Sequence, residues 1–351
     1  FFIGTLCNGG AERVVSILAS HMAKQGMDVE VLTYYDRQVS YELDKGVKLT
    51  AVETLTDSGN KLKNLLAIRK YFKKNAKVVI SFLAPFNIMA TAANFGNGVP
   101  MIVADRNDPT KVPTNTVVRK LRDYLYMAAD GIVLQTEKNK AYFNRIVQKK
   151  SVVIYNPVDM KEYAGVALKI PKEKIVVSAG RLMKQKNQKM MIDAFAGVLK
   201  EYPDYQLIIY GEGPYREELE SYILKLGISE KVLLPGSTTQ LYDSIKRAEI
   251  FLLSSDYEGM PNALIEAMCM GLPVISTKVS GATDLISHGK NGFLVELDDR
   301  ACFEKAILDM LGDKENARNM AEKAVKLNEL LKTETIFQQW LQLIDKTGVK
   351  K

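Results

Sequence analysis

The chain has 351 residues, enough for two domains of similar size, each with its own buried core. Hydrophobic residues make up 47% and charged residues 25%, which excludes a protein with many membrane spans, and no apolar stretch reaches the roughly 18 residues that a spanning helix needs. The net charge of +7 is uneven, with 22 Lys and Arg against 13 Asp and Glu in residues 1–157 and 26 against 28 in the remainder. Two interpretations follow for the basic half. Its charges are simply solvated, or they bind an anionic partner, which could be membrane lipid or nucleic acid.

Short apolar runs alternate with amphipathic segments through the first half. Residues 11–25 place their apolar side chains on one helical face, which predicts a helix. Strand-like runs occur at 1–6, 29–35, 47–52, 77–82, 101–104, 131–136 and 151–155. Helical patterns separate most of them, as expected of a parallel sheet with crossover helices.

The second half repeats this pattern, with strands expected at 174–180, 205–211, 231–236, 249–255, 273–277 and 292–296. Most of these runs end in Gly, Ser or Thr, so their carboxyl ends are predicted to open into ligand-binding loops. Pro157 interrupts the pattern near the middle of the chain. We therefore expect two doubly wound α/β domains, 1–157 and 158–334, followed by a helix over 335–351 whose Trp340, the single Trp, docks on a domain.

The cysteine and histidine content argues against disulfides and against a metal centre. The three cysteines are widely spaced and odd in number, which indicates reduced thiols in a cytoplasmic protein. His21 and His288 are too few for a Cys/His cluster, and no Asp-x-Asp pair is present. The sequence predicts chemistry without a metal.

Two carboxylates stand out in "DYEGMPNALIEAM". Glu266 lies in the otherwise uncharged run from Met260 to Thr277, where a desolvated carboxylate costs several kcal/mol unless it is hydrogen-bonded. Glu258 is expected on the loop after a strand, and Pro261 near the start of the helix that carries Glu266. Two interpretations remain open: a core ion pair for Glu266 with Glu258 in solvent, or a ribose diol and a hexose hydroxyl as their partners.

Two further segments could bind phosphate. Gly9 and Gly10 follow a strand and open a helix, where backbone amides favour an anion, although glycines are also common in tight βα turns. Arg181 and Lys186 follow a strand in the second half and suit a diphosphate, although such cations are often merely solvated. The first segment is not G-x-G-x-x-G, which argues against a nicotinamide oxidoreductase.

Together these motifs resemble the retaining glycosyltransferases of family 4. The resemblance rests on "NGGAERV", "GRLMKQKN", "YGEGPYREELE", the Glu-x7-Glu spacing of Glu258 and Glu266, and "AMCMGLPVI", in this order along essentially the whole chain. Within the family, the chain is most similar to bacterial enzymes that elongate polyisoprenyl-diphosphate-linked oligosaccharides, including N-acetylgalactosamine transferases, and to capsule and exopolysaccharide transferases. The resemblance implies the GT-B fold, two Rossmann-like domains facing a cleft, with the C-terminal helix packing back on the N-terminal domain.

The resemblance also implies a set of donor-binding residues. Arg181 and Lys186 would bind the donor diphosphate, Glu266 the ribose, and Glu258 the transferred sugar. Further contacts are implied for Gly9, Gly10, Gly236, Ser237, Gly259, Met260, Pro261, Asn262 and Leu264. No cofactor and no metal are implied, because the two cations would stabilise the leaving diphosphate.

One position departs from the family pattern. Many members carry a His in the loop where "VADRNDPTK" has Arg106. A front-face retaining mechanism needs no protein base, so Arg106 is compatible with activity. Two interpretations remain: Arg106 binds a phosphate or an acceptor anion, with Asp105 or Asp108 holding it, or it forms a structural Arg–Asp pair.

The expected reaction is transfer of a hexose or N-acetylhexosamine from a UDP-sugar to a lipid-linked or other cell-surface saccharide. "KLKNLLAIRKYFKK" (61–74) and "VVRKLRDYLY" (117–126) are basic and amphipathic, which suits either an anionic membrane or an ordinary solvated helix. A cytoplasmic location is expected, with peripheral attachment to the inner face of the plasma membrane left open. The alternatives are a GT-B sugar-nucleotide epimerase, a transferase with a soluble acceptor, and a nucleic-acid-binding protein, for which no recognition motif is present.

Overall fold

The structure is a computed structural model that describes residues 1–7, 9–56 and 60–348. The chain divides into two compact units, Phe1–Pro157 with Leu331–Lys351, and Val158–Leu330. Among the helices of the described residues, none is both long and apolar enough to cross a bilayer. Each unit contains its own parallel sheet, so two α/β units are confirmed.

The first unit is built on a seven-stranded sheet with the order β3-β2-β1-β4-β5-β6-β7, and every pairing is parallel. The strands are β1 (Phe2–Ile3), β2 (Val29–Thr33), β3 (Val47–Ala51), β4 (Val79–Phe82), β5 (Met101–Ala104), β6 (Gly131–Leu134) and β7 (Ser151–Val153). Each falls within a predicted strand-like run. The strand order reverses between β1 and β4, and ligands of open α/β sheets bind at the carboxyl ends beside such a reversal.

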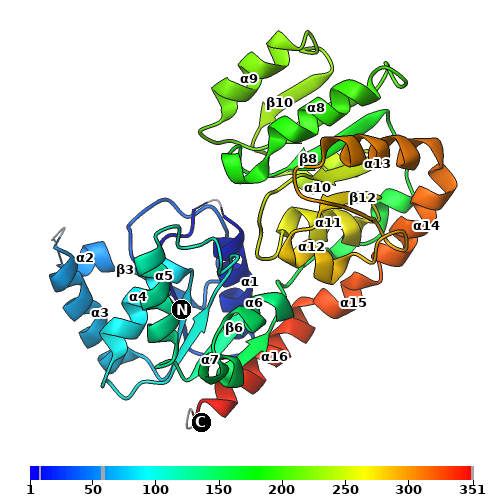
Figure 1. Ribbon diagram of the computed structural model, residues 1–351. Helices are drawn as coiled ribbons and strands as arrows, with labels where there is room; N and C mark the ends of the chain where they lie inside the picture. Colours follow the sequence, from blue (N-terminus) through cyan, green and yellow to red (C-terminus); the bar gives the residue numbers. More distant parts are fainter. Residues whose placement is uncertain (8, 57–59, 349–351) are drawn as a thin grey trace. The chain divides into compact units, whose positions relative to one another are not determined.

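Helices cover both faces of this sheet (Figure 1). The helices of the unit are α1 (Gly10–Lys24), α2 (Val52–Thr56), α3 (Lys61–Asn75), α4 (Ala84–Asn94), α5 (Thr116–Tyr126), α6 (Glu137–Tyr142), α7 (Arg145–Lys150) and α16 (Thr333–Lys346). One face packs on α1 and α16, and the other on α3, α4, α5 and α7. The expected return of the C-terminal helix to the N-terminal domain is therefore confirmed: Trp340 is fully buried and stacks on Phe82, with 5.7 Å between ring centroids.

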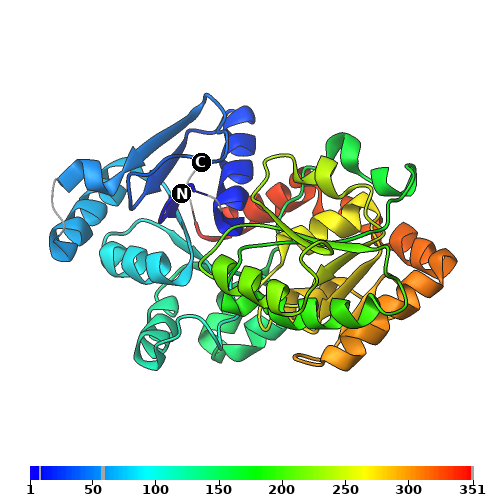
Figure 2. The same cartoon turned by 90° about the horizontal axis from the view of Figure 1, so that it is seen from above.

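The second unit contains a six-stranded parallel sheet with the order β10-β9-β8-β11-β12-β13. Its strands are β8 (Ile175–Ala179), β9 (Gln206–Tyr210), β10 (Val232–Gly236), β11 (Ile250–Leu253), β12 (Val274–Thr277) and β13 (Phe293–Val295). Its helices are α8 (Gln188–Val198), α9 (Arg216–Lys225), α10 (Leu241–Ile245), α11 (Asn262–Met270), α12 (Ser280–Leu285), α13 (Arg300–Gly312), α14 (Lys314–Ala324) and α15 (Leu327–Leu331), the last ending at the division between the units. Helices α8, α9 and α13 share one core with the strands, and a second view shows the strands between helices (Figure 2). Here the order reverses between β8 and β11, and the carboxyl ends of the strands beside such a reversal are where open α/β sheets bind ligands.

Candidate active site

The loops after β8 and β11 bring a lysine and a glutamate into direct contact. Lys186 Nζ lies 2.5 Å from Glu258 Oε1, and the Ser255 hydroxyl donates to the same oxygen at 2.7 Å. Glu258 is 8% exposed, so the ion pair is largely desolvated and its carboxylate is held in one orientation. Since β8 and β11 are the neighbours at which the strand order reverses, the pair lies where open α/β sheets commonly bind ligands. The interpretation that left Glu258 in solvent is wrong.

Hydrogen bonds fix the two loops to each other on both sides of this pair. The Ser254 hydroxyl donates to the Lys186 carbonyl at 2.7 Å, and the Gln185 side chain donates to the Tyr257 carbonyl at 2.7 Å. The Asp256 amide donates to the Gln185 carbonyl at 2.8 Å. Each of these bonds joins residues that are far apart in the sequence, so the spacing of motifs could not reveal it. They hold the lysine and the glutamate before any substrate binds.

Glu266 lies on α11, which begins at Asn262 directly after Pro261, as the sequence predicted. Glu266 is 3% exposed, and its charge, after burial, is the second cause that raises the pKa of the neighbouring Cys269 thiol to about 12. Met260 and Leu264 are buried as well, whereas Asn262 is half-buried. The segment is therefore a buried helix start with one carboxylate inside it, and the ribose role of Glu266 stays a prediction.

Glycines at several positions around these loops allow close approaches or an unusual backbone conformation. A Cβ on Gly213 would lie 2.2 Å from the Leu182 carbonyl oxygen, and one on Gly281, in α12, would lie 2.4 Å from the Gly259 carbonyl oxygen. Gly236 ends β10 with φ 94°, a conformation that favours glycine, and Ser237 after it is exposed. Sequence reasoning missed Gly281, because nothing in "STKVSGATD" shows which loop it touches. Arg181 is exposed near the same carboxyl edge.

In the first unit, Gly10 begins α1 and Gly9 precedes it, so the predicted helix opening is confirmed. The Gly9 amide donates to the Tyr41 hydroxyl at 3.3 Å, and that hydroxyl donates to the Gly9 carbonyl at 3.1 Å. A Cβ on Gly9 would lie 2.1 Å from Glu12 Oε2. A side chain at position 9 would need only the Glu12 carboxylate to move, so close packing does not by itself require this glycine. Phosphate binding by this turn stays a prediction.

Asp105 and Arg106, after β5, point to opposite faces of the sheet. Asp105 accepts from the Tyr126 hydroxyl at 3.1 Å and lies 3.6 Å from Arg122 Nη1 on α5, and its pKa is raised because burial outweighs the Arg122 charge. Arg106 instead lies over Phe82 and Trp340, on the face covered by α16. Because side chains of an extended chain alternate between faces, neighbours in sequence cannot share one partner here. A structural Arg–Asp pair does exist, but Arg122 forms it, which the sequence analysis missed.

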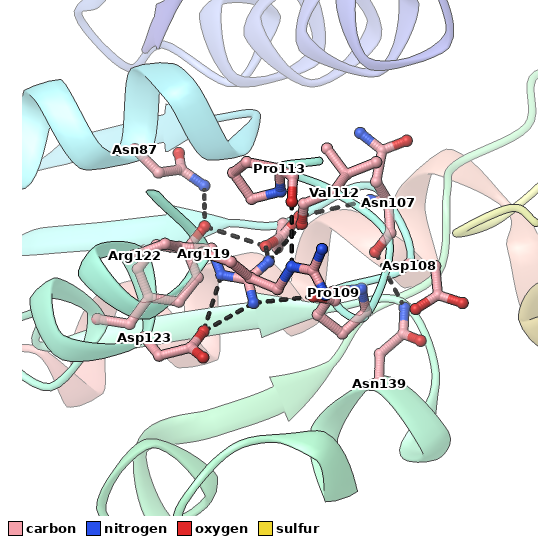
Figure 3. Close-up of polar contacts among 12 residues, drawn as sticks. Asn87, Asn107, Asp108, Pro109, Val112, Pro113, Arg119, Arg122, Asp123 and Asn139 are labelled. Carbon is pink, nitrogen blue, oxygen red and sulfur yellow. Dashed lines mark hydrogen bonds and ion pairs between the residues drawn. The ribbon is translucent and has the colours of Figure 1, made fainter. Parts of the chain in front are cut away.

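Arg122 and Arg119 also fix the loop between β5 and α5 (Figure 3). Arg122 donates to the carbonyls of Val112 at 2.5 Å and Pro109 at 3.0 Å, and binds Asp123 at 2.7 Å. Asp108, the other expected partner of Arg106, instead caps Thr110, whose amide donates to Asp108 Oδ1 at 2.8 Å. The expectation that Asp105 or Asp108 holds Arg106 by an ion pair is therefore not met.

Comparison with known proteins identifies the family. The family described as Glycosyltransferase Family 4 matches residues 8–162, and that described as Glycosyl transferases group 1 matches residues 159–327. An α-1,4-N-acetyl-D-galactosaminyltransferase of Campylobacter jejuni, acting on a GalNAc-GalNAc-diNAcBac-PP-undecaprenol substrate according to its name, is 30% identical over 98% of this chain and 97% of its own length. The chain belongs to the family 4 glycosyltransferases.

A second relative agrees with this assignment, and solved structures share the fold. The glycosyltransferase is 31% identical, over 92% of each chain, to a second Campylobacter jejuni enzyme, an N-acetylgalactosamine-N,N'-diacetylbacillosaminyl-diphospho-undecaprenol 4-alpha-N-acetylgalactosaminyltransferase. Among solved structures, HepE of Anabaena in complex with UDP and glucose has a TM-score of 0.85 at 18% identity, covering 98% of each chain. Sucrose-phosphate synthase of Thermosynechococcus elongatus has a TM-score of 0.82 at 19% identity, also over 98% of each chain. These likenesses confirm the GT-B fold.

The predicted site residues of the glycosyltransferase fall into two sets. Arg181, Lys186, Gly236, Ser237 and the segment 258–266 lie at the carboxyl edge of the second sheet or in the loops and helix that follow it, whereas Gly9, Gly10 and Arg106 lie in the first unit. Among the described residues, no group of three or more His, Cys, Asp or Glu side chains could hold a metal ion.

Proposed function

We propose that this glycosyltransferase transfers a hexose or N-acetylhexosamine from a UDP-sugar to a polyisoprenyl-diphosphate-linked saccharide. The names of the two Campylobacter relatives specify N-acetylgalactosamine transfer to such lipid-linked acceptors. A UDP-Gal:alpha-D-GlcNAc-diphosphoundecaprenol alpha-1,3-galactosyltransferase of Escherichia coli, 26% identical over 87% of this chain, specifies a UDP-sugar donor. Galactose or N-acetylgalactosamine is therefore the first sugar to test, with glucose and N-acetylglucosamine next.

The contact between Lys186 and Glu258 is the observation that carries this proposal. In a sugar nucleotide the transferred sugar is bonded directly to the outer phosphate, so the groups that bind the two must be neighbours. Lys186 and Glu258, 2.5 Å apart where the strand order of the sheet reverses, meet this requirement. Lys186, with Arg181, would bind the diphosphate, and Glu258 would accept hydrogen bonds from sugar hydroxyls.

The proposed reaction retains the anomeric configuration and uses no metal. The bond between the anomeric carbon and the phosphate oxygen breaks, and the acceptor hydroxyl forms its bond on the same face of the sugar. The acceptor proton passes to the departing phosphate oxygen, so no protein base is needed. Arg181 and Lys186 would stabilise the charge that develops on the diphosphate, which is the task of a metal in other transferases.

The acceptor lipid suggests that the first unit works at an anionic membrane. On α3, Leu62 and Leu66 are 65% and 57% exposed and are flanked by exposed lysines. On α5, Val117 and Tyr124 are 76% and 68% exposed. Apolar side chains within a basic surface suit insertion between anionic head groups. Peripheral attachment to the cytoplasmic face of a membrane is part of the proposal.

A screen of UDP-sugars against a short-chain polyisoprenyl-diphosphate-linked saccharide tests this function. We expect transfer with one or two UDP-sugars, an α-linked product from an α-linked donor, and an unchanged rate in EDTA. Transfer to a free saccharide with none to the lipid-linked one would favour the soluble-acceptor alternative, and interconversion of the sugar nucleotide would favour an epimerase. Absence of any UDP-sugar turnover, with no thermal stabilisation by UDP, would contradict the proposal.

A further inference from the structure

Arg106 is a buried cation without a hydrogen-bond partner among the described residues. The residue is 6% exposed, and Nε, Nη1 and Nη2 are all buried and unpaired within the described part of the chain. Its guanidinium carbon lies 4.9 Å from the centre of the Phe82 ring and 5.9 Å from that of Trp340. Burial lowers the pKa of Arg106 to about 9, against the raising effect of the Asp105 charge, so the side chain stays protonated at neutral pH.

Arg122, on the opposite face of the same sheet, shows what a structural buried arginine looks like in this protein. Its guanidinium contacts the carboxylates of Asp105 and Asp123 and the carbonyls of Val112 and Pro109. Arg106 makes none of these contacts. Stacking on aromatic rings compensates only part of the cost of desolvating a cation, so the resting position of Arg106 is poorly satisfied.

Two further features distinguish this place from an ordinary packed core. Trp340 Nε1, in the same stack, is also buried and unpaired within the described residues. Leu83, directly after Phe82, has φ 72°, in the left-handed region that residues other than glycine rarely adopt. Backbone strain and unsatisfied donors cluster at binding sites, and this site lies at the carboxyl ends of β4 and β5, the edge where α/β sheets bind ligands.

We propose that Arg106 binds a phosphoanion of a substrate, and that its guanidinium leaves the stack with Phe82 and Trp340 to do so. Both unsatisfied groups are donors, and a phosphate or diphosphate offers only acceptors. The guanidinium is covered in the stacked position, so the anion reaches it only after the side chain rotates. The inference rests on the proposed function, because donor and acceptor of that reaction both carry a diphosphate, and either one could supply the anion.

Trp340 provides a direct test, because it is the single Trp of the chain and its emission responds to a cation leaving the indole. The protein is titrated at constant ionic strength with UDP and, separately, with farnesyl diphosphate, a short polyisoprenyl diphosphate. We expect a saturable change in emission with one of the two, which identifies the donor or the acceptor as the source. In Arg106→Met the change should be absent, and the KM for that substrate should rise roughly 10- to 100-fold.

Two variants control the experiment. Lys149→Met removes one exposed positive charge of the same unit, and its titration and KM should match those of the native protein. Arg106→Lys keeps the charge without the planar fork, and should retain a weaker response. The inference is overturned if Arg106→Met is folded and keeps both native KM values, or if neither anion changes the emission of the native protein. A lack of UDP-sugar turnover would instead count against the proposed function, since the emission titration needs no turnover.

Discussion

Glu258 accepts hydrogen bonds from Lys186 and Ser255 at a single carboxylate oxygen, so its second oxygen is held in one orientation. Such preorganisation matters because an interaction that strengthens toward the transition state raises turnover, whereas one that is equal in both states only improves binding. At the residue scale, the two glutamates of the motif should therefore differ in what their removal costs.

Glu258→Gln tests this difference. The amide keeps the shape of the carboxylate but loses the charge that faces Lys186, so kcat should fall roughly 100-fold while affinity for UDP changes little. Glu266→Gln is the matched comparison and should mainly weaken UDP binding. Steady-state kinetics and calorimetric titration with UDP measure the two effects. Equal losses in both variants would contradict the separate roles.

Arg122 and Arg106 make a second comparison at this scale. Arg122→Met leaves Asp105 buried without its cation, which should lower the free energy of unfolding of the first unit by about 3–5 kcal/mol. Within the described residues no carboxylate pairs with Arg106. Arg106→Met should therefore lower the free energy of unfolding by less than Arg122→Met does. Urea unfolding followed by Trp340 emission reports on the first unit, to which this residue belongs. A larger loss for Arg106→Met would mean that its stacking is a major source of stability.

At the scale of elements, packing of α12 positions the loop after β11, in addition to the hydrogen bonds that this loop makes. Gly281, the second residue of α12, lies against the segment 259–261 so closely that a Cβ would also fall 2.7 Å from Pro261 Cδ. That segment carries Gly259 and leads into α11. A small displacement there would move groups predicted to bind the donor.

Gly281→Ala should therefore lower kcat/KM roughly 10- to 100-fold by displacing the 259–261 segment, since catalysis is sensitive to shifts near 1 Å. Gly312→Ala is the control, because a Cβ at that position, the last of α13, would meet only Tyr202 Oη at 3.7 Å. Kinetics and thermal unfolding of both variants are compared. Native activity in a folded Gly281→Ala variant would show that the segment tolerates the shift.

At the scale of the whole molecule, the charge separates along the chain. Residues 1–157 hold the excess of Lys and Arg, and the exposed lysines of α3 surround the exposed Leu62 and Leu66. Electrostatic attraction to anionic lipid contributes about 1 kcal/mol per basic residue near the surface and weakens with salt. We therefore expect the intact enzyme to bind anionic membranes through α3, and to bind them less as salt rises.

Vesicle flotation measures the binding of the protein to anionic lipid. The native protein should float with vesicles containing phosphatidylglycerol and less with neutral ones, and binding should decrease as salt rises. Reversing the charges of Lys61, Lys63, Lys70 and Lys73 should weaken binding at least about 100-fold. Reversing four exposed lysines of the second unit, Lys200, Lys225, Lys290 and Lys323, should leave binding unchanged. Equal binding by both variants would contradict a membrane surface on α3.

The sequence alone determined the fold class, the strands and the motifs that are predicted to bind the donor. Apolar runs and the 3.6-residue period are local properties, so the predicted strand-like run at 249–255 became β11, and the helix expected after Pro261 became α11. The glutamates and cations of the motif could likewise be identified one by one, since their residue types indicate their chemistry.

Only the tertiary structure decided which of these groups meet. The contact of Lys186 with Glu258 depends on the adjacency of β8 and β11, which the parallel crossover topology sets across a long stretch of chain. Asp105 pairs with Arg122 rather than with Arg106 because alternation along an extended segment sends consecutive side chains to opposite faces, toward α5 and α16. The guanidinium of Arg106, unpaired within the described residues, lies beside Trp340 of α16, more than two hundred residues later in the chain. Local patterns fix secondary structure, whereas long-range packing decides which charges are paired and which are left for a substrate.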